Sequence, residues 1–384
     1  MIPTAYESAW TTEETRIFRN SVRQLVEREF VPHEVRWGRQ GRADKDAWLK
    51  AGQAGLLLAD VPKEYGGAGG TFAHEAVVVE ELARAGVHVG LGIQGIVAHY
   101  ILAYGNEAQR RRWLPRLASG ELIAAIGMTE ADAGSDLQAV KTTARRDGEH
   151  YVVNGSKTFI TNGTNAGLLC LAVRMADAKP GPRALTMLVL ETEGLAGYRV
   201  GRSLEKIGRP AQDACELFFD DVRVPVGNVL GGEGRGLMQM MEQLPYERLS
   251  IALSAVAATE RAIEITAEYV KSRKLYGKPL VELQATRFKL AEAKTEAHVG
   301  RVFVDDCIGR FVAGSFDAVT AAMAKLWLTE MQCRVIDDCV QLHGGYGYMW
   351  EYPVARAWAD ARVQRIYAGT NEVMKLIVSR ALLG

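Results

Sequence analysis

Residues 150–161 read HYVVNGSKTFIT, a β-prone stretch that stands between two long helical regions. Two runs rich in β-branched and aromatic residues flank Asn154-Gly155, the residue pair that type I′ hairpin turns prefer. The stretch therefore predicts a β-hairpin. Further strands are expected at 168–173, 185–191 and 215–219.

On both sides of this segment, apolar residues recur at helical spacing. Helices are expected over 47–58, 72–85, 90–104, 108–118, 247–271, 281–313 and 316–342, and again after Gly369. Long, nearly unbroken helices after residue 236 favour an antiparallel four-helix bundle. We therefore expect an α+β protein that is mostly α. Its predicted parts are an N-terminal helical domain (1–120), a central antiparallel β domain (121–235) and a C-terminal four-helix bundle (236–384).

The composition excludes several classes of protein. The 384 residues exceed what one hydrophobic core usually spans. Lys and Arg balance Asp and Glu at 46 each, so no overall field attracts nucleic acid or an anionic membrane. No apolar run approaches the roughly 20 residues of a membrane span. Residues 1–7 show neither the basic nor the apolar part of a signal peptide, so a cytoplasmic protein is expected.

Cysteine and histidine give no sign of a metal site. The five cysteines form no CxxC pair, and their number is odd, which favours reduced thiols over a disulfide framework. The seven histidines are scattered and include no HExxH motif. We expect no bound metal.

Two segments in the first half could hold a flat ligand. In 127–136, GMTEADAGSD, small residues let the backbone approach a ring, and N–H groups and hydroxyls can bond its edge. In 159–163, FITNG, an aromatic side chain precedes a threonine hydroxyl. In isolation, the first segment is better explained as a polar loop and the second as a strand end.

Three segments in the second half could hold phosphate groups. Arg273, in 273–280, can grip a pyrophosphate in bidentate fashion, although the segment also suits a simple helix–helix connection. The glycines of 341–348 can admit phosphates or cap a helix. Residues 369–372 read as a helix N-terminus, whose free N–H groups attract phosphate.

Taken together and in this order, the five segments resemble the acyl-CoA dehydrogenase family. The resemblance covers nearly the whole chain and includes the 62–67 loop, PKEYGG, and the 221–225 strand end, DVRVP. The C-terminal third looks closest to the long-chain branch, notably LPYERL at 244–249 and QLHGGYGYMWEYP at 341–353.

The resemblance implies FAD bound between the β domain and the bundle, in a homotetramer built as a pair of dimers. By match, the residues around the flavin and its phosphates are Met128, Thr129, Gly134, Ser135, Phe159, Thr161, Thr370 and Asn371. The ADP half of an FAD held mainly by the neighbouring subunit would be bound by Arg273, Tyr276, Gln284, Gln341, Gly344 and Gly345. Phe159 stands where tryptophan is commoner, and Tyr276 where phenylalanine is usual.

The resemblance also implies which residue acts as the base. In 365–372, RIYAGTNE, Ala368 stands where the family often has a glutamate that removes a proton from the substrate. Glu247 stands where the isovaleryl and long-chain branches keep their base. The alternatives are a solvated Glu247-Arg248 pair on a helix, or Glu372 as the base. Pro245 is expected to kink or start the helix and so to direct the carboxylate.

By the same match, the acyl-CoA thioester would contact Ser135, Arg248, Ala368 and Gly369. The implied reaction removes an α proton and transfers a β hydride to flavin N5, which gives a trans-2-enoyl-CoA. The electrons would pass to an electron-transfer flavoprotein, as in fatty acid β-oxidation, and the substrate would be a medium, long or branched acyl-CoA.

Three other functions compete with this one. An acyl-CoA oxidase would usually carry an extra C-terminal helical domain, whereas this chain ends at Gly384. A DNA-associated flavoprotein needs a positive surface, which the balanced charge argues against. A purely structural bundle would bind no flavin.

Overall fold

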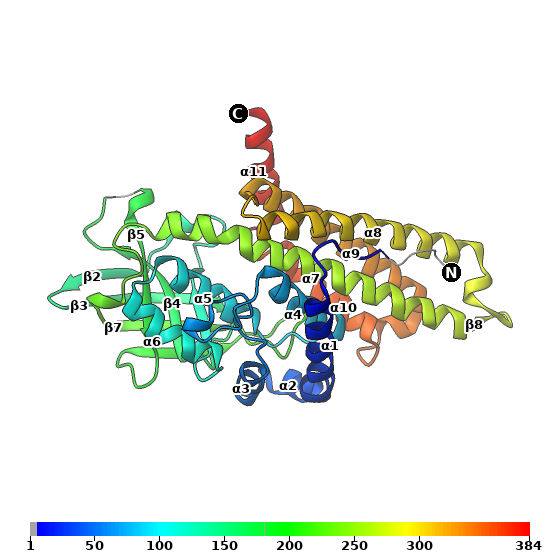
Figure 1. The fold of residues 1–384 in the computed structure, drawn as a ribbon, viewed down its shortest axis with the longest axis horizontal. Coiled ribbons are helices and arrows are strands. Elements are labelled where there is room, and N and C mark those ends of the chain that lie inside the picture. Colours follow the sequence, from blue (N-terminus) through cyan, green and yellow to red (C-terminus); the bar gives the residue numbers. More distant parts are fainter. Residues whose placement is uncertain (1–5, 180) are drawn as a thin grey trace.

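The computed structural model describes residues 6–179 and 181–384. Part of the stretch that argues against a signal peptide, residues 1–5, therefore lies outside the described residues. Figure 1 shows an elongated molecule with the β-sheet at one end and long helices running to the other. The shorter N-terminal helices lie along one side of both. The predicted order of helical region, sheet and helical region is confirmed.

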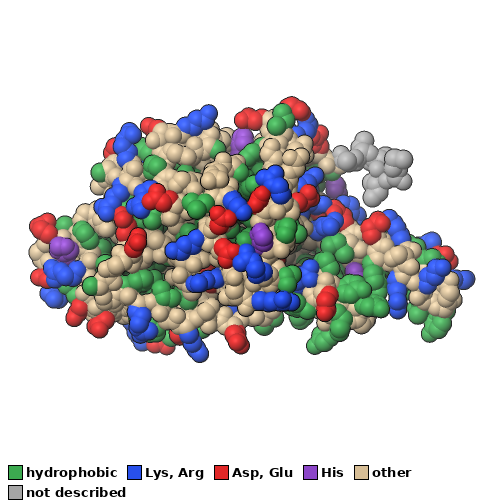
Figure 2. Space-filling view, turned by 90° about the horizontal axis from the view of Figure 1, so that it is seen from below, with side chains coloured by type: hydrophobic (Ala, Val, Ile, Leu, Met, Phe, Trp, Pro, Cys, Tyr) green, Lys and Arg blue, Asp and Glu red, His purple; other side chains and the backbone are tan. Residues whose placement is uncertain are grey.

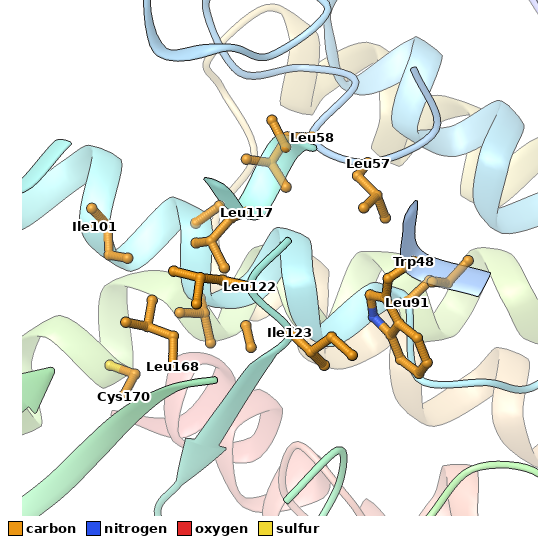
Figure 3. Packing of buried hydrophobic residues seen from close by; sticks show 14 of the residues in the cluster. Trp48, Leu57, Leu58, Leu91, Ile101, Leu117, Leu122, Ile123, Leu168 and Cys170 are labelled. Atoms are coloured by element: carbon orange, nitrogen blue, oxygen red, sulfur yellow. The ribbon is translucent and has the colours of Figure 1, made fainter. Parts of the chain in front are cut away.

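The N-terminal region is helical, and its largest buried side chains join it to the sheet. Its helices are α1 (Glu13–Leu25), α2 (Glu34–Gln40), α3 (Asp46–Gln53), α4 (Phe72–Ala85), α5 (Gly92–Tyr104) and α6 (Glu107–Ala118). Figure 3 shows Trp48, Ile101 and Leu117 in one apolar cluster with Leu168 and Cys170 of the sheet. The first helices and the β domain therefore share a core.

Within the described residues, the middle region forms a seven-stranded sheet. Its strands are β1 (Ala124–Gly127), β2 (Thr143–Asp147), β3 (His150–Ile160), β4 (Leu168–Met175), β5 (Leu185–Glu191), β6 (Tyr198–Ser203) and β7 (Cys215–Pro225). Most pairs are antiparallel as predicted, but β1 and β2 pair with β4 in parallel. The sheet is mixed because β1 borders the first half of β4 and β2 borders its end, both in the direction of β4.

The predicted hairpin turn at Asn154-Gly155 is wrong. β3 runs through both residues, and its hairpin partner is the preceding strand β2. Asn154 instead binds Asp221 of β7 through two hydrogen bonds of 2.9 Å, one from the side-chain amide and one from the Asp221 N–H. The register between β3 and β7 shifts at this point, so the Asn-Gly pair makes a bulge in place of a turn.

The C-terminal region is helical. It contains α7 (Gly236–Ser272), the short strands β8 (Lys274–Leu275) and β9 (Lys278–Pro279), α8 (Gln284–Val312), α9 (Ala318–His343), α10 (Pro353–Ala361) and α11 (Asn371–Leu383). In Figure 1, α7, α8 and α9 lie side by side, and α11 stands away from their long axis. Helix α7 begins at Gly236, so Pro245 lies inside it and does not start it.

No helix among the described residues is both long and apolar enough to cross a membrane. Their five cysteines are all free thiols. On the face shown in Figure 2, basic and acidic side chains are interspersed.

Candidate functional site

The first wall of the candidate site is the end of β3. Phe159 is 67% exposed, although it is a large aromatic residue. Its φ of 59° lies in the left-handed region that few non-glycine residues adopt, so the surroundings must hold it there. The next turn is fixed by Asp213, which accepts hydrogen bonds of 2.9 Å from the N–H groups of Asn162 and Thr164. The hydroxyl of Thr161 accepts from Gln212 at 3.3 Å.

The loop at 127–136 is held against this strand by a buried ion pair. The ammonium of Lys157 donates to Glu130 Oε1 at 2.8 Å and to the Met128 carbonyl at 3.1 Å. Glu130 also accepts the N–H of Thr142 at 2.9 Å. Burial raises the pKa of Glu130, but the hydrogen bonds from Lys157 and Thr142 outweigh it, so this carboxyl stays ionised with a lowered pKa.

The tip of the same loop is open. Gly134 and Ser135 are exposed, and a Cβ built on Gly134 would meet no described atom within 4 Å. Met128 and Thr129 are half-buried, and the carbonyl of Thr129 accepts the N–H of Thr158 in β3 at 3.0 Å. The loop is therefore fixed to β3 at residues 128–130, while its tip at 134–135 leaves the backbone accessible.

The second wall is α7, which carries Glu247. The side chain is half-buried, but its Oε1 is shielded from solvent and finds no hydrogen-bond partner among the described residues. Burial raises the pKa of Glu247 to about 7, against the opposing charge of Arg248. Burial also raises the pKa of Tyr100 and of Cys170, and the nearby charge of Glu247 adds to both shifts. The carboxylate therefore lies near Tyr100 of α5 and Cys170 of β4.

Arg248 joins α7 to the turn before α11. This side chain is buried, and its Nε donates to the Ala368 carbonyl at 3.2 Å. Ala368 has a φ of 52°, again in the left-handed region. Its own N–H donates to no acceptor in the described part of the chain. A Cβ on Gly369 would lie 2.9 Å from the Met374 side chain, so the turn is packed closely.

The next residues begin α11. Thr370 is the N-cap, with its hydroxyl accepting the Val373 N–H at 3.4 Å. Asn371 is buried, and its side chain is bonded to Lys325, Thr329 and Glu330 of α9. A phosphate contact from Asn371 is therefore left to its backbone N–H. Glu372, the rival base, is exposed.

A third group of predicted residues lies at the far end of α7. Arg273, Gln341, Gly344 and Gly345 line a cavity of about 550 Å³. The Arg273 guanidinium lies 5.3 Å from the centre of the Tyr346 ring. The helical rise of 1.5 Å per residue places Arg273 roughly 40 Å from Glu247 along α7.

The remaining two predicted residues of this group lie near the same end. Tyr276 is 95% exposed on the turn between β8 and β9, and Gln284 is exposed at the start of α8. Neither lines the cavity. A larger cavity of about 950 Å³ lies between α2, α4, α7 and α10, and none of the predicted site residues is among those that line it.

Sequence reasoning missed the residues that hold these walls in place, namely Glu130, Lys157, Asp213 and Lys325. A charged residue in a strand or helix usually lies on the surface, and so a lone lysine attracts no attention. One signal was present. Lys325 is the single charged residue in the apolar stretch AVTAAMAKLWLT at 318–329.

The arrangement suits proton abstraction. A carboxylate with a pKa near 7 can accept a proton at neutral pH more readily than an ordinary glutamate. Arg248, the next residue on α7, binds the Ala368 carbonyl, so the turn that carries the unused Ala368 N–H is joined to the helix of the base. Both groups are donors for negative charge that develops on a substrate.

Comparisons with known proteins identify the family of this chain. Models of the N-terminal, middle and C-terminal domains of acyl-CoA dehydrogenase match residues 12–121, 125–222 and 234–383. The mitochondrial long-chain specific acyl-CoA dehydrogenase of Sus scrofa is 44% identical over 97% of this chain and 87% of its own length.

Solved structures give the same result. The acyl-CoA dehydrogenase of Geobacillus kaustophilus has a TM-score of 0.96 and 45% identity, over 98% of this chain and 100% of its own. A glutaryl-CoA dehydrogenase of Mycobacterium smegmatis in complex with FADH2 has a TM-score of 0.90 and 28% identity, over 98% of this chain and 96% of its own. The chain belongs to the acyl-CoA dehydrogenase family, enzymes that act on the CH–CH bond of acyl-CoA.

Proposed function

We propose that this enzyme uses FAD to dehydrogenate an acyl-CoA between the α and β carbons, with Glu247 as the base. The observation that carries the proposal is the Glu247 carboxylate, whose shielded Oε1 has no hydrogen-bond partner in the described part of the chain and whose pKa is about 7. Ala368 has no ionisable side chain, and Glu372 is exposed. Glu247 is half-buried with a shielded Oε1, and its neighbour Arg248 binds the turn at 368–369.

The residues present fit FAD. Phe159 offers an exposed aromatic face, Thr161 a hydroxyl, and Gly134 an open backbone. Arg273 lies at a cavity lined by glycines, where a diphosphate can enter. The M. smegmatis relative was solved with FADH2. When bound, FAD would accept the β hydride at N5.

The protein residues would do the rest of the chemistry. Glu247 would take the α proton, since burial weakens its preference for the ionised form and so makes it a stronger base. The Ala368 N–H would donate to the thioester carbonyl, on which negative charge grows as the proton leaves. Tyr100 and Cys170, both fully buried, would keep water from this side of the carboxylate. The product would be a trans-2-enoyl-CoA.

The residues at the far end of α7 would serve the FAD of a neighbouring subunit. Arg273 and Glu247 are too far apart for one FAD to touch both in a single chain. We therefore propose that Arg273, Tyr276, Gln284, Gln341, Gly344 and Gly345 hold the ADP half of a partner's FAD. This requires at least a dimer and agrees with a homotetramer built from two dimers.

The proposed substrate is a medium, long or branched acyl-CoA, and the proposed electron acceptor is an electron-transfer flavoprotein. A base on α7 accompanies such substrates in the family branches that the sequence resembles. Val97, Tyr100 and Ile101 are fully buried on α5, and the charge of Glu247 raises the pKa of Tyr100, so we propose that these three residues limit the length of the acyl chain.

The test is turnover of a panel of acyl-CoA thioesters with a dye acceptor, for the wild type and for Glu247→Gln. The variant should keep its flavin absorbance and lose turnover by about 10³-fold or more. Glu372→Gln is the matched control and should remain active. A Glu247→Gln enzyme with substantial activity would refute the base assignment. Release of peroxide by the wild type in air would favour an oxidase.

A further inference from the structure

Lys325 of α9 is one of the largest fully buried side chains, with 0% exposure. Its ammonium donates to the Gly369 carbonyl and to Asn371 Oδ1, both at 2.8 Å. Both acceptors belong to the turn that precedes and begins α11. The hydrogen bonds of Lys325 therefore hold a turn far along the chain.

Asn371 is held from two more points on the same helix. Its amide donates to Thr329 Oγ1 at 3.0 Å and to Glu330 Oε1 at 2.8 Å. Lys325 and Thr329 lie four positions apart, so they share one face of α9. Glu330 is itself fixed by Arg365, whose Nε donates to it at 3.0 Å. The network joins α9 rigidly to the start of α11.

A second cation holds the residue before Gly369. Arg248 donates to the Ala368 carbonyl, so two buried cations hold two consecutive carbonyls of the turn. In a trans peptide the N–H points away from the carbonyl of the same unit. Fixing both carbonyls therefore fixes the two peptide planes that follow Ala368. The plane that carries the Ala368 N–H is joined to them through φ of Ala368.

The conformation of Ala368 requires that the turn be held by hydrogen bonds such as those from Arg248 and Lys325. Its φ of 52° is costly for any residue with a Cβ, and such a conformation persists only where its surroundings determine it. If the turn relaxed to negative φ, the peptide plane that carries the Ala368 N–H would rotate. That N–H is the donor to the thioester carbonyl under the proposed function, on which this inference rests.

We propose that Lys325 is a positioning residue for the Ala368–Asn371 turn and keeps the Ala368 N–H directed at the thioester carbonyl. It acts through Gly369 and Asn371 and touches neither substrate nor cofactor. Its replacement should therefore slow the chemical step and leave binding of the acyl-CoA nearly unchanged.

The variant is Lys325→Met, which keeps the length of the side chain and removes its donors. Hydrogen exchange of the backbone amides at 366–372, measured by mass spectrometry, should become at least 10-fold faster than in the wild type. Lys289→Met is the matched control, because Lys289 is an exposed lysine that binds Asp338 across the surface at 2.9 Å. It should leave the exchange of this segment unchanged.

A second measurement follows the donor itself. A 3-thia-acyl-CoA has an acidic α proton but gives up no β hydride, so its ionisation in the site can be titrated by absorbance. In Lys325→Met the midpoint of this titration should rise by about one pH unit, because a misplaced N–H stabilises the enolate less. With a good substrate, kcat should fall about 10- to 100-fold and KM should change less than threefold.

The outcomes separate the two proposals. Wild-type exchange at 366–372 together with an unshifted midpoint in Lys325→Met would overturn the role of Lys325. If the wild type neither ionises the analogue nor turns over acyl-CoA, the proposed function fails, while the exchange result still decides whether Lys325 holds the turn. If Lys325→Met does not fold, Lys325→Gln, which can keep one donor, is judged by the same two criteria.

Discussion

Among the described residues, two lysines are fully buried, and they have different hydrogen-bond partners. Lys157 of β3 forms an ion pair with Glu130 at 2.8 Å, and both side chains are shielded from solvent. Lys325 of α9 donates to a carbonyl and to an amide oxygen. Each secures one wall of the candidate site, the first the loop at 127–136 and the second the turn at 368–371.

The difference concerns what remains when the lysine is lost. Burial lowers the pKa of each lysine to about 8, so both ammonium groups pay for their position in the interior. Without Lys157, a charged carboxylate stays in the core. Without Lys325, two neutral acceptors stay there. The first site should therefore matter most for stability, and the second for the conformation of the turn.

The largest effect is expected for Lys157→Met. The variant leaves Glu130 buried without its cation and should lower the free energy of unfolding by about 3–5 kcal/mol. Urea unfolding of the apoprotein at pH 7 measures this. Lys141→Met is the control, because Lys141 binds Asp132 at 2.8 Å on the exposed surface and should matter little. Equal free energies of unfolding for Lys157→Met and Lys141→Met would contradict the importance of the buried Lys157–Glu130 pair.

Glu247 extends the comparison to an acid with no hydrogen-bond partner for its Oε1 among the described residues. Its pKa is raised from 4.5 to about 7, so the folded protein holds a proton that the unfolded chain has lost between these pH values. Stability therefore falls as pH rises from about 4.5 to 7, and the cost is complete above 7.

Glu247→Gln removes this cost. The variant should gain roughly 1–3 kcal/mol at pH 8 and little near pH 4, where the wild-type carboxyl is protonated in both states. Thermal unfolding of the apoprotein across this range checks it. Glu242→Gln, an exposed position on the same helix, should show no such gain. A gain that does not depend on pH would mean that ionisation of Glu247 is not the cause.

The sequence predicted the helices well because their signals are local. The expected range 72–85 coincides with α4, and 185–191 coincides with β5. The hairpin at Asn154-Gly155 was wrong because its outcome depends on Asp221, which lies in another strand. A local turn preference is weaker than a pair of hydrogen bonds across the sheet.

The candidate site was predictable in its motifs and not in its supports. Glu247, Arg248 and Ala368 stand in recognisable segments, and the structure brings Arg248 to Ala368. Lys325 meets Gly369 from another helix, and neither the contact nor the positive φ of Ala368 has a local sequence signal. Such contacts follow from tertiary packing alone.

Lys325→Met should lower the free energy of unfolding by about 1–2 kcal/mol, less than Lys157→Met. The loss leaves the Gly369 carbonyl without a donor and the Asn371 amide oxygen with only the Thr329 hydroxyl at 3.4 Å, but it also removes a buried charge. The same urea unfolding at pH 7 compares the two. If both variants lose the same free energy of unfolding, then removing the lysine from neutral acceptors destabilises the protein as much as removing it from a carboxylate.

The smallest effect on stability is expected when Lys157 and its partner Glu130 are both replaced by uncharged residues. In Lys157→Met/Glu130→Gln, the carboxylate is replaced by an amide, whose oxygen can still accept the N–H of Thr142. The Lys141 N–H, which binds the other carboxylate oxygen at 2.7 Å, loses its acceptor. Neither residue of the pair then leaves a charge in the core. The free energy of unfolding of the double variant should therefore be only about 1 kcal/mol lower than that of the wild type, and higher than that of Lys157→Met alone. Urea unfolding of all four proteins completes the double-mutant cycle. If the double variant is as unstable as the single one, the lost packing of Lys157, and not the abandoned charge of Glu130, sets the stability of this wall.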